Sequence, residues 1–316
     1  MDHLAGKRHL WFAISGILLV PCVLSLIFFG LNFGIDFTGG SSWELQYDRE
    51  VNTEDISQIL SDSGRDGATV QQVGDSSEHR YLIRMEELDE GSAEKAEIEQ
   101  KLSTLGTLNP EGESLSTVGA SVGESIRNRS GFAVLAASLG ILLYIAFAFR
   151  NTQNPLLYAV AAIVAMLHDA LFVLGVFSIL GKVSGVEVDA LFITALLTVI
   201  GFSVHDTIVV FDRIRENLAM HVSPRFEEIV NYSIVQTLVR SVNTSITVVI
   251  TLSALYLFGG SSTREFVLAL LIGVVVGTYS SIFNASQILV AWENGEVQGV
   301  WNRIFRRSST TQPSAT

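Results

Sequence analysis

The sequence predicts a polytopic α-helical membrane protein with an acidic α+β domain between the first two of six transmembrane helices. Hydrophobic residues occupy 48% and charged residues only 16% of the 316 positions, which is too apolar for a soluble domain of this length. The net charge of -12 has one origin, because residues 31–130 hold 20 acidic and 8 basic side chains while the rest holds 12 of each. That segment therefore predicts a water-exposed domain, and its acidity argues against nucleic acid as a partner.

Six apolar runs are long enough to cross a bilayer, since about 20 helical residues span a hydrocarbon core of about 30 Å. The first run follows Lys7 and Arg8 as a signal peptide would, but it exceeds the usual ~7–15 apolar residues and no A-x-A cleavage site follows it. We interpret this run as an uncleaved anchor. The runs lie near residues 10–30, 131–150, 155–181, 189–211, 235–258 and 265–291.

Basic residues predict the orientation of the chain, because Lys and Arg concentrate in cytoplasmic loops. If both termini are cytoplasmic, the short outer loops hold only Lys182 and Arg264, as expected for a multi-pass protein of the plasma (inner) membrane. The inner side then holds Lys7, Arg8, Arg150, Arg213, Arg215, Arg225, Arg303, Arg306 and Arg307. The expected segments are 1–30 (cytoplasmic N-terminus and first helix), 31–130 (extracytoplasmic domain), 131–292 (five-helix bundle) and 293–316 (cytoplasmic tail).

Short strands and helices alternate in the acidic segment. Apolar alternation predicts strands at 41–47, 68–73, 80–85 and 114–119, with helices near 53–62 and 92–105. This β-α-β-β-α-β order is that of a ferredoxin-like domain. The segment contains no Ser-His-Asp set and no phosphate-binding glycine loop, and His79 is its only candidate metal ligand. We interpret its acidic residues as a solvated surface.

Asp206 lies inside the fourth apolar run, where a lone carboxylate costs roughly 3 kcal/mol on insertion scales. The next run carries a polar row on one helical face, and Arg240 in that row lies at the same depth as Asp206. A salt bridge is therefore predicted, either as simple neutralisation or as a switch in which protonation of Asp206 lets the two helices shift. The row consists of Gln236, Arg240, Asn243, Thr247 and Thr251.

Two His-Asp pairs, His168-Asp169 and His205-Asp206, also lie within apolar runs. Successive helix residues point about 100° apart, so the members of a pair are not expected to share a face. The pairs could ligate zinc together, but hydrogen-bonded helix contacts are the simpler interpretation and a proton relay remains open. We expect no cofactor or metal and no enzymatic activity. Gly273 and Gly277 form a G-x-x-x-G that indicates either tight helix packing or chance in a Gly-rich helix.

Four motifs resemble those of SecF, a family of protein-export membrane subunits: "GIDFTGG" (34–40), "HDALFVLG" (168–175), "GFSVHDTIVVFDRIREN" (201–217) and "RSVNTSITV" (240–248). The resemblance implies half of a resistance-nodulation-division transporter, with SecD supplying the other half. It also implies association with the SecYEG channel and use of the proton gradient to draw preproteins outward. The proton-linked aspartate and arginine of the family correspond to Asp206 and Arg240.

The same resemblance places the first motif at the membrane-water boundary, where its glycines permit tight turns. The sequence departs from the family at His205, where Asn is frequent, and at Ala120, where Pro is common. The first departure leaves open a second pH-sensitive group beside Asp206. The motif residues concerned are Gly34, Asp36, Gly39 and Gly40.

Three functions remain to be distinguished. A proton-driven accessory subunit of protein secretion is the leading interpretation. A small-molecule or lipid exporter of the resistance-nodulation-division type would use the same carboxylate, but such exporters generally carry both halves in one chain. A scaffold that couples to no protons would tolerate Asp206→Asn and Arg240→Met.

Overall fold

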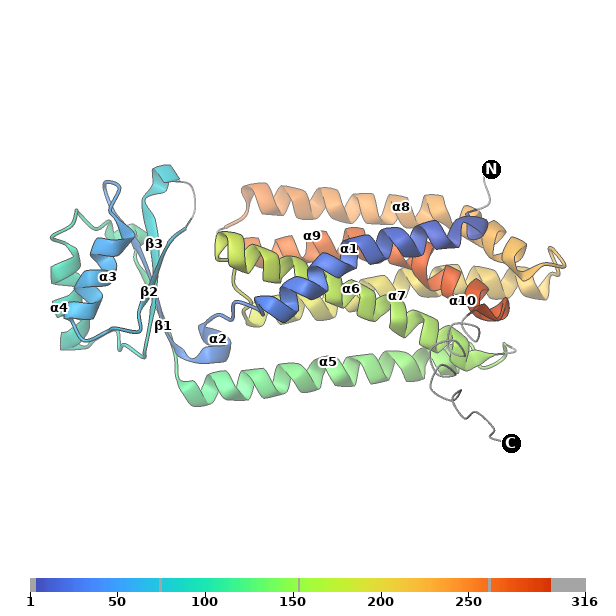
Figure 1. Ribbon diagram of the computed structural model, residues 1–316, viewed down its shortest axis with the longest axis horizontal. Helices are drawn as coiled ribbons and strands as arrows, with labels where there is room; N and C mark the ends of the chain where they lie inside the picture. Colours follow the sequence, from blue (N-terminus) through green and yellow to red (C-terminus); the bar gives the residue numbers. More distant parts are fainter. Residues whose placement is uncertain (1–3, 74–75, 153, 261–262, 297–316) are drawn as a thin grey trace, which may run out of the picture. The chain divides into compact units, whose positions relative to one another are not determined.

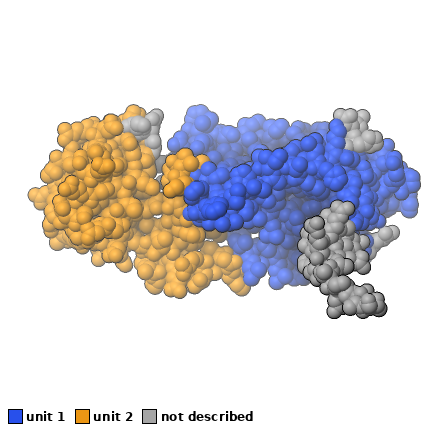
Figure 2. Space-filling model, viewed as in Figure 1, with its two compact units in different colours: residues 1–30, 134–179, 194–316 blue, residues 31–133, 180–193 orange. Residues whose placement is uncertain are grey.

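The computed structural model describes residues 4–73, 76–152, 154–260 and 263–296, so most of the expected tail at 293–316 lies outside the described residues. The chain divides into two compact units, coloured separately in Figure 2. The helical unit comprises residues 1–30, 134–179 and 194–316, and the outer unit comprises residues 31–133 and 180–193. The loop around residue 187 thus belongs with the α+β domain, although residues 134–179 separate the two in sequence.

Six helices are long and apolar enough to span a membrane, which confirms the predicted helical membrane fold. Several extend beyond the predicted runs, because charged first and last turns lower the local hydropathy without ending a helix. Helix α5 begins 11 residues before the predicted start at 131, and α7 continues to Ala219. The spans in Figure 1 are α1 (Arg8–Phe28), α5 (Ala120–Ala148), α6 (Pro155–Ser184), α7 (Ala190–Ala219), α8 (Phe226–Phe258) and α9 (Arg264–Ser280), the last continued by a π-helical turn (Ser281–Ala285) and α10 (Ser286–Glu293).

The six spans differ in how much of their surface the chain itself covers. In α6, α7 and α9 with α10, 44–50% of the apolar window is buried. The corresponding values are 11% in α8 and only 6% in α5. These two helices therefore present most of their surface to whatever surrounds this chain, whereas α6, α7 and α9 form its packed centre.

Glycines let helices of the packed centre approach closely. A Cβ added to Gly273 of α9 would come within 2.1 Å of Val199 on α7, and one added to Gly277 within 3.0 Å of the Ser203 Cβ. The tight packing predicted from the G-x-x-x-G spacing is thus confirmed. Gly175 of α6 plays the same part against Cys22 of α1, where an added Cβ would come within 2.2 Å.

The outer unit contains a four-stranded antiparallel sheet of the order β2-β3-β1-β4, the ferredoxin-like arrangement predicted. Both of its helices begin at a side-chain cap, since Asn52 accepts a hydrogen bond from the backbone of Glu54 and Ser92 from that of Lys95. The elements are β1 (Gly40–Gln46), α3 (Thr53–Asp62), β2 (Thr69–Val73), β3 (Arg80–Met85), α4 (Ala93–Leu102) and β4 (Ser114–Val118).

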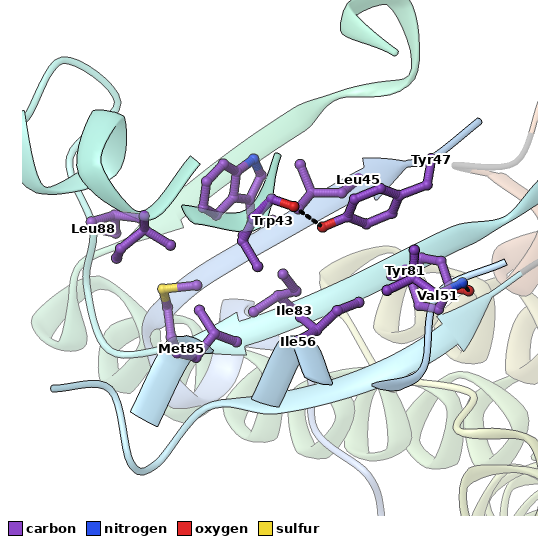
Figure 3. Packing of buried hydrophobic residues seen from close by; sticks show 12 residues of the cluster. Trp43, Leu45, Tyr47, Val51, Ile56, Tyr81, Ile83, Met85 and Leu88 are labelled. Carbon is purple, nitrogen blue, oxygen red and sulfur yellow. Dashed lines mark hydrogen bonds between the residues drawn. The ribbon is translucent and has the colours of Figure 1, made fainter. Parts of the chain in front are cut away.

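One face of this sheet packs against α3 and α4 to form the core in Figure 3. Strands β1 and β3 alternate between buried and partly exposed positions, as expected of strands covered on one side. Trp43 and Leu45 of β1 and Ile83 of β3 are completely buried, and Ile56 and Leu60 of α3 close over them. The alternation thus gives the sheet one face that α3 and α4 cover and one that they leave open.

Candidate intramembrane site

Asp206 lies near the middle of α7, about 24 Å from Ala190 and about 20 Å from Ala219 at 1.5 Å per residue. Its side chain is buried, with 3% of the residue exposed. The hydroxyl of Ser241 on α8 lies beside the carboxyl group. Within the described ranges, however, neither Asp206 Oδ2 nor Ser241 Oγ completes a hydrogen bond. Asp206 is therefore an incompletely satisfied acid in the interior of the helical unit.

Arg240 does not pair with this acid. Among the residues that the structure describes, no ion pair joins the two side chains, and Arg240 is exposed. The reason is rotational: Arg240 and Ser241 are consecutive and point about 100° apart, and Ser241 is the one that faces α7. Equal depth, the basis of the expected salt bridge, fixes position along a helix but not direction around it.

The whole polar row of α8 shares the exposure of Arg240. Its members Gln236, Asn243, Thr247 and Thr251 are all exposed. The buried stripe of α8 lies on another face and consists mainly of small or hydroxyl-bearing residues, namely Ile229, Val230, Ser233, Ile234, Thr237, Ser241 and Ser245. Gln236 also accepts hydrogen bonds from Arg213 and Asn217 of α7, so it is the remaining four members of the row that form a surface of this chain rather than a lining of its interior.

A second acid, Asp169 of α6, is completely buried and fully hydrogen-bonded. Its Oδ2 accepts hydrogen bonds from Ser203 Oγ of α7 at 2.5 Å and from Ser280 Oγ of α9 at 2.6 Å. Its Oδ1 lies 2.9 Å from His168 Nδ1. The two side chains thus meet although they leave the helix in different directions, and the interpretation of the pair as a hydrogen-bonded contact agrees with this geometry.

His205 does not share this arrangement, since it is exposed on the other side of α7 from Asp206. The charges that follow pair within the helix, Asp212 with Arg215 and Arg213 with Glu216, each at 2.5 Å. Nowhere in the described chain do three His, Cys, Asp or Glu side chains gather closely enough to hold a metal ion.

The outer end of α7 is held by the "GIDFTGG" motif. Asp36 Oδ2 accepts a hydrogen bond from Ala190 N at 2.9 Å, and Asp189 Oδ1 accepts one from Phe192 N at 2.7 Å. Two carboxylates thus satisfy backbone N–H groups in the first turn of the helix that carries Asp206. Beside them the backbone of 32–34 pairs with Val188 through hydrogen bonds of 2.8 and 2.9 Å.

The double glycine of the motif serves this geometry. Gly39 and Gly40 adopt φ values of +72° and +108°, which L-residues with side chains rarely adopt. A Cβ at Gly39 would come within 2.8 Å of Ala120 Cα, and one at Gly40 within 2.6 Å of the Met85 carbonyl oxygen. Asp189 was identifiable in the sequence as an acid preceding a helix, whereas the contact between Asp36 and Ala190 spans 154 residues and has no local signal.

Burial raises the pKa of the Glu187 carboxyl, although its ion pair with Arg84 of β3 opposes the effect. Burial likewise raises the pKa of Asp189, with the Phe192 N–H opposing and the negative charge of Asp36 adding to the rise. A carboxyl whose pKa is higher in the folded state stabilises that state more when protonated, and this advantage is lost as pH rises through the raised pKa.

We therefore expect the pairing of 32–36 with 185–190 to gain stability as pH falls from neutral toward the ordinary carboxyl range near about 4. Amide hydrogen exchange at Gly34 and Val188, corrected for intrinsic rates, should show stronger protection on acidification. Glu187→Gln should flatten part of this dependence. Amide protection that weakens on acidification would contradict the raised pKa values of Glu187 and Asp189 in the folded chain.

Comparison with known proteins agrees with this architecture. The profile of "Protein export membrane protein SecD/SecF, C-terminal" matches residues 97–295, and that of the "SecD/SecF GG Motif" matches residues 24–51. The chain is 53% identical to the protein translocase subunit SecF of Thermobaculum terrenum, over 98% of this chain and 97% of that one. It is 36% identical to the protein translocase subunit SecDF of Bacillus subtilis, covering 93% of this chain but 38% of that protein.

Among solved structures, the chain is similar to SecDF of Thermus thermophilus, described as a translocon-associated membrane protein. The TM-score is 0.79 at 35% identity, over 92% of this chain and 38% of the SecDF chain. The chain therefore spans well under half of the single-chain SecDF proteins but nearly the full length of the SecF relative.

Six spans, a ferredoxin-like domain between the first two and buried acids in the bundle define a polytopic membrane transport subunit. The chain belongs to the SecD/SecF family of protein-export membrane proteins. It is accordingly an accessory subunit of Sec protein export.

Proposed function

We propose that this chain draws on the proton gradient through Asp206, together with a SecD half and the SecYEG channel, to promote the outward movement of preproteins. The observation that carries the proposal is the burial, in the middle of α7, of a carboxyl whose Oδ2 makes no hydrogen bond within the described residues. Intramembrane acids that face a bundle interior most often mark proton or ion pathways. The role is mechanical coupling rather than catalysis of a covalent step.

The energy available is sufficient for such a switch. Burial makes an ionised Asp206 costly, because the nearby Arg240 and His205 are exposed and screened by their surroundings, whereas a protonated Asp206 carries no charge to bury. Each proton driven by roughly 150 mV supplies about 3.5 kcal/mol, which shifts an equilibrium between two packing arrangements several hundred-fold. The movable contact would be the one between Asp206 on α7 and Ser241 on α8.

The exposed polar row of α8 supports the SecD half as the partner. Arg240 in a membrane-spanning helix is costly when it faces lipid, so a polar surface of another subunit is its expected cover. An acid on the SecD side would provide the counter-charge that Asp206 does not provide here. The same proposal places the chain in the plasma membrane with both termini cytoplasmic, which the distribution of basic residues favours.

Replacing Arg240 by Met should remove stimulation of export by the proton gradient while leaving assembly intact. The measurement compares preprotein transport into inverted vesicles with and without an uncoupler, alongside copurification of SecD. Val239→Met is the matched control, because Val239 is 67% exposed on α8 and adjacent in sequence but carries no charge. Export by Arg240→Met that still falls on adding the uncoupler, as it does in the parent, would contradict the proposal.

A further inference from the structure

Asp169 is the most deeply buried acid of the helical unit and lies halfway along its span, about 21 Å from Pro155 and about 22 Å from Ser184. Its hydrogen bonds come from His168 on its own helix and from serines on two others, α7 and α9. Neither the fold nor the proposed use of Asp206 requires a titratable group here, since an amide could also accept the serine hydrogen bonds.

The charges around Asp169 leave it without a permanent counterion. Helix α1 has no charged side chain after His9, and α9 through α10 has none between Glu265 and Glu293. The middle of α7 contributes only Asp206, of the same sign, and His205, which is exposed on another face. Apart from His168, α6 has only Lys182 near its outer end. An ionised Asp169 beside a neutral His168 is therefore a buried net negative charge, which one bound proton cancels.

His168 and Asp169 bind that proton as a unit. With Nδ1 and Oδ1 2.9 Å apart, the proton forms either an imidazolium-carboxylate pair or a carboxylic acid beside a neutral imidazole, and both are net neutral. In the described part of the chain, His168 Nε2 has no hydrogen-bond partner. The His168 side chain borders an apolar groove formed by α1, α6 and α9, whose lining includes Leu18, Phe172, Val275 and, among the described residues, the one further titratable side chain there, Tyr279.

Protonation of this pair changes how α6 holds its neighbours. A hydrogen bond from a hydroxyl to a carboxylate is roughly twice as strong as one to a neutral group, so an acid at 169 that takes the proton binds Ser203 and Ser280 less firmly. Ser203 lies one helical turn from Asp206 on α7. Ser280 directly precedes the π-helical turn, a local widening of the kind often found at functional sites.

We propose that the His168-Asp169 pair is a second proton-binding site of this chain and that its occupancy sets how firmly α6 holds α7, the helix of Asp206. Proton binding stands on the geometry alone, whereas the coupling to export rests on the proposed function. The two parts are tested separately.

Proton binding is tested by infrared difference spectra, acidic minus neutral pH, of the full chain in lipid vesicles. In an Asp206→Asn background, a band of a buried carboxylic acid or of a protonated imidazole should remain, and adding Asp169→Asn should abolish it. Ser280→Ala removes a donor that favours the ionised form, so the band should develop at a higher pH than in the parent. Difference spectra that are the same with and without Asp169 would show that the pair does not bind a proton. If Asp169→Asn fails to fold, a Ser280→Ala chain whose band develops at the same pH as in the parent would show the same.

Coupling is tested by export into inverted vesicles that contain the partner subunits. Asp169→Asn should lose stimulation by the proton gradient and Ser280→Ala should shift its pH profile, which a merely structural role would not do. Ser138→Ala on α5 is the control, because its hydroxyl bonds only to its own helix. If the proton gradient stimulates export fully in Asp169→Asn but not in Asp206→Asn, the pair is not coupled to export, and the proposed function stands. If the proton gradient stimulates export fully in Asp206→Asn, the proposed function is refuted. The infrared spectra would still show whether the His168-Asp169 pair binds a proton.

Discussion

An Asp206→Asn chain is expected to assemble normally and to export preproteins only at the rate measured without a proton gradient. The amide has the same shape as the acid and can still lie beside Ser241, but it cannot ionise at any pH in the range of the assay. Because the substitution replaces a buried acid, whose Oδ2 makes no hydrogen bond within the described residues, with a neutral group, thermal stability should be unchanged or higher. Loss of activity with retained stability is the signature of a proton carrier rather than of a structural contact.

The matched control is Asp212→Asn, the same chemical change six residues further along α7. The Asp212 side chain is 56% exposed and pairs with Arg215 within the helix, an arrangement worth about 1 kcal/mol or less. It should transport like the parent. Uncoupler-sensitive export by Asp206→Asn at the level of the parent would remove Asp206 from the mechanism.

Gly273→Leu is expected to have the largest effect on stability. Its side chain would have to occupy the space of Val199, a β-branched residue whose Cβ already lies within 2.9 Å of the position of an added Cβ. Overpacking of this kind typically costs about 1–3 kcal/mol, and separating α7 from α9 would in addition draw Ser203 away from Asp169. The yield of monodisperse protein after heating in detergent should fall accordingly.

Gly140→Leu on α5 provides the comparison, since nothing lies within 4 Å of an added Cβ there. The same apolar side chain is added to a membrane-spanning helix in both variants, so only the contact with α7 differs. Equal thermal stability of the two variants would show that the close approach of α7 and α9 is not maintained in the protein.

A feature could be predicted from the sequence when the residues that form it lie close together in the chain. The strands and helices of the outer unit were predictable to within a few residues, because alternation and capping act over a few neighbours. The six spans were predictable from the length of apolar runs. The contacts of Asp169 with Ser203 and Ser280 bridge 34 and 111 residues, and no periodicity in the sequence signals them.

The candidate site shows the same limit within a single helix. The cost of burying Asp206 and the shared depth of Arg240 were both readable from hydropathy and rise per residue. The direction in which Arg240 points was not, because the polar row and the buried stripe of α8 are equally regular patterns separated by one position. Only the packing of small residues against α9 selects which of them faces inward.

The sparse self-coverage of α5 and α8 has a consequence for the life of the newly made subunit. A chain inserted before its partner arrives carries Arg240 and a ladder of amides and hydroxyls directly against acyl chains. If the proposed function holds, we expect a chain without its partner to be retained by insertion chaperones or removed by membrane proteases. Balanced synthesis of the two halves then becomes a requirement of biogenesis, and relatives that fuse both halves into one polypeptide satisfy it automatically.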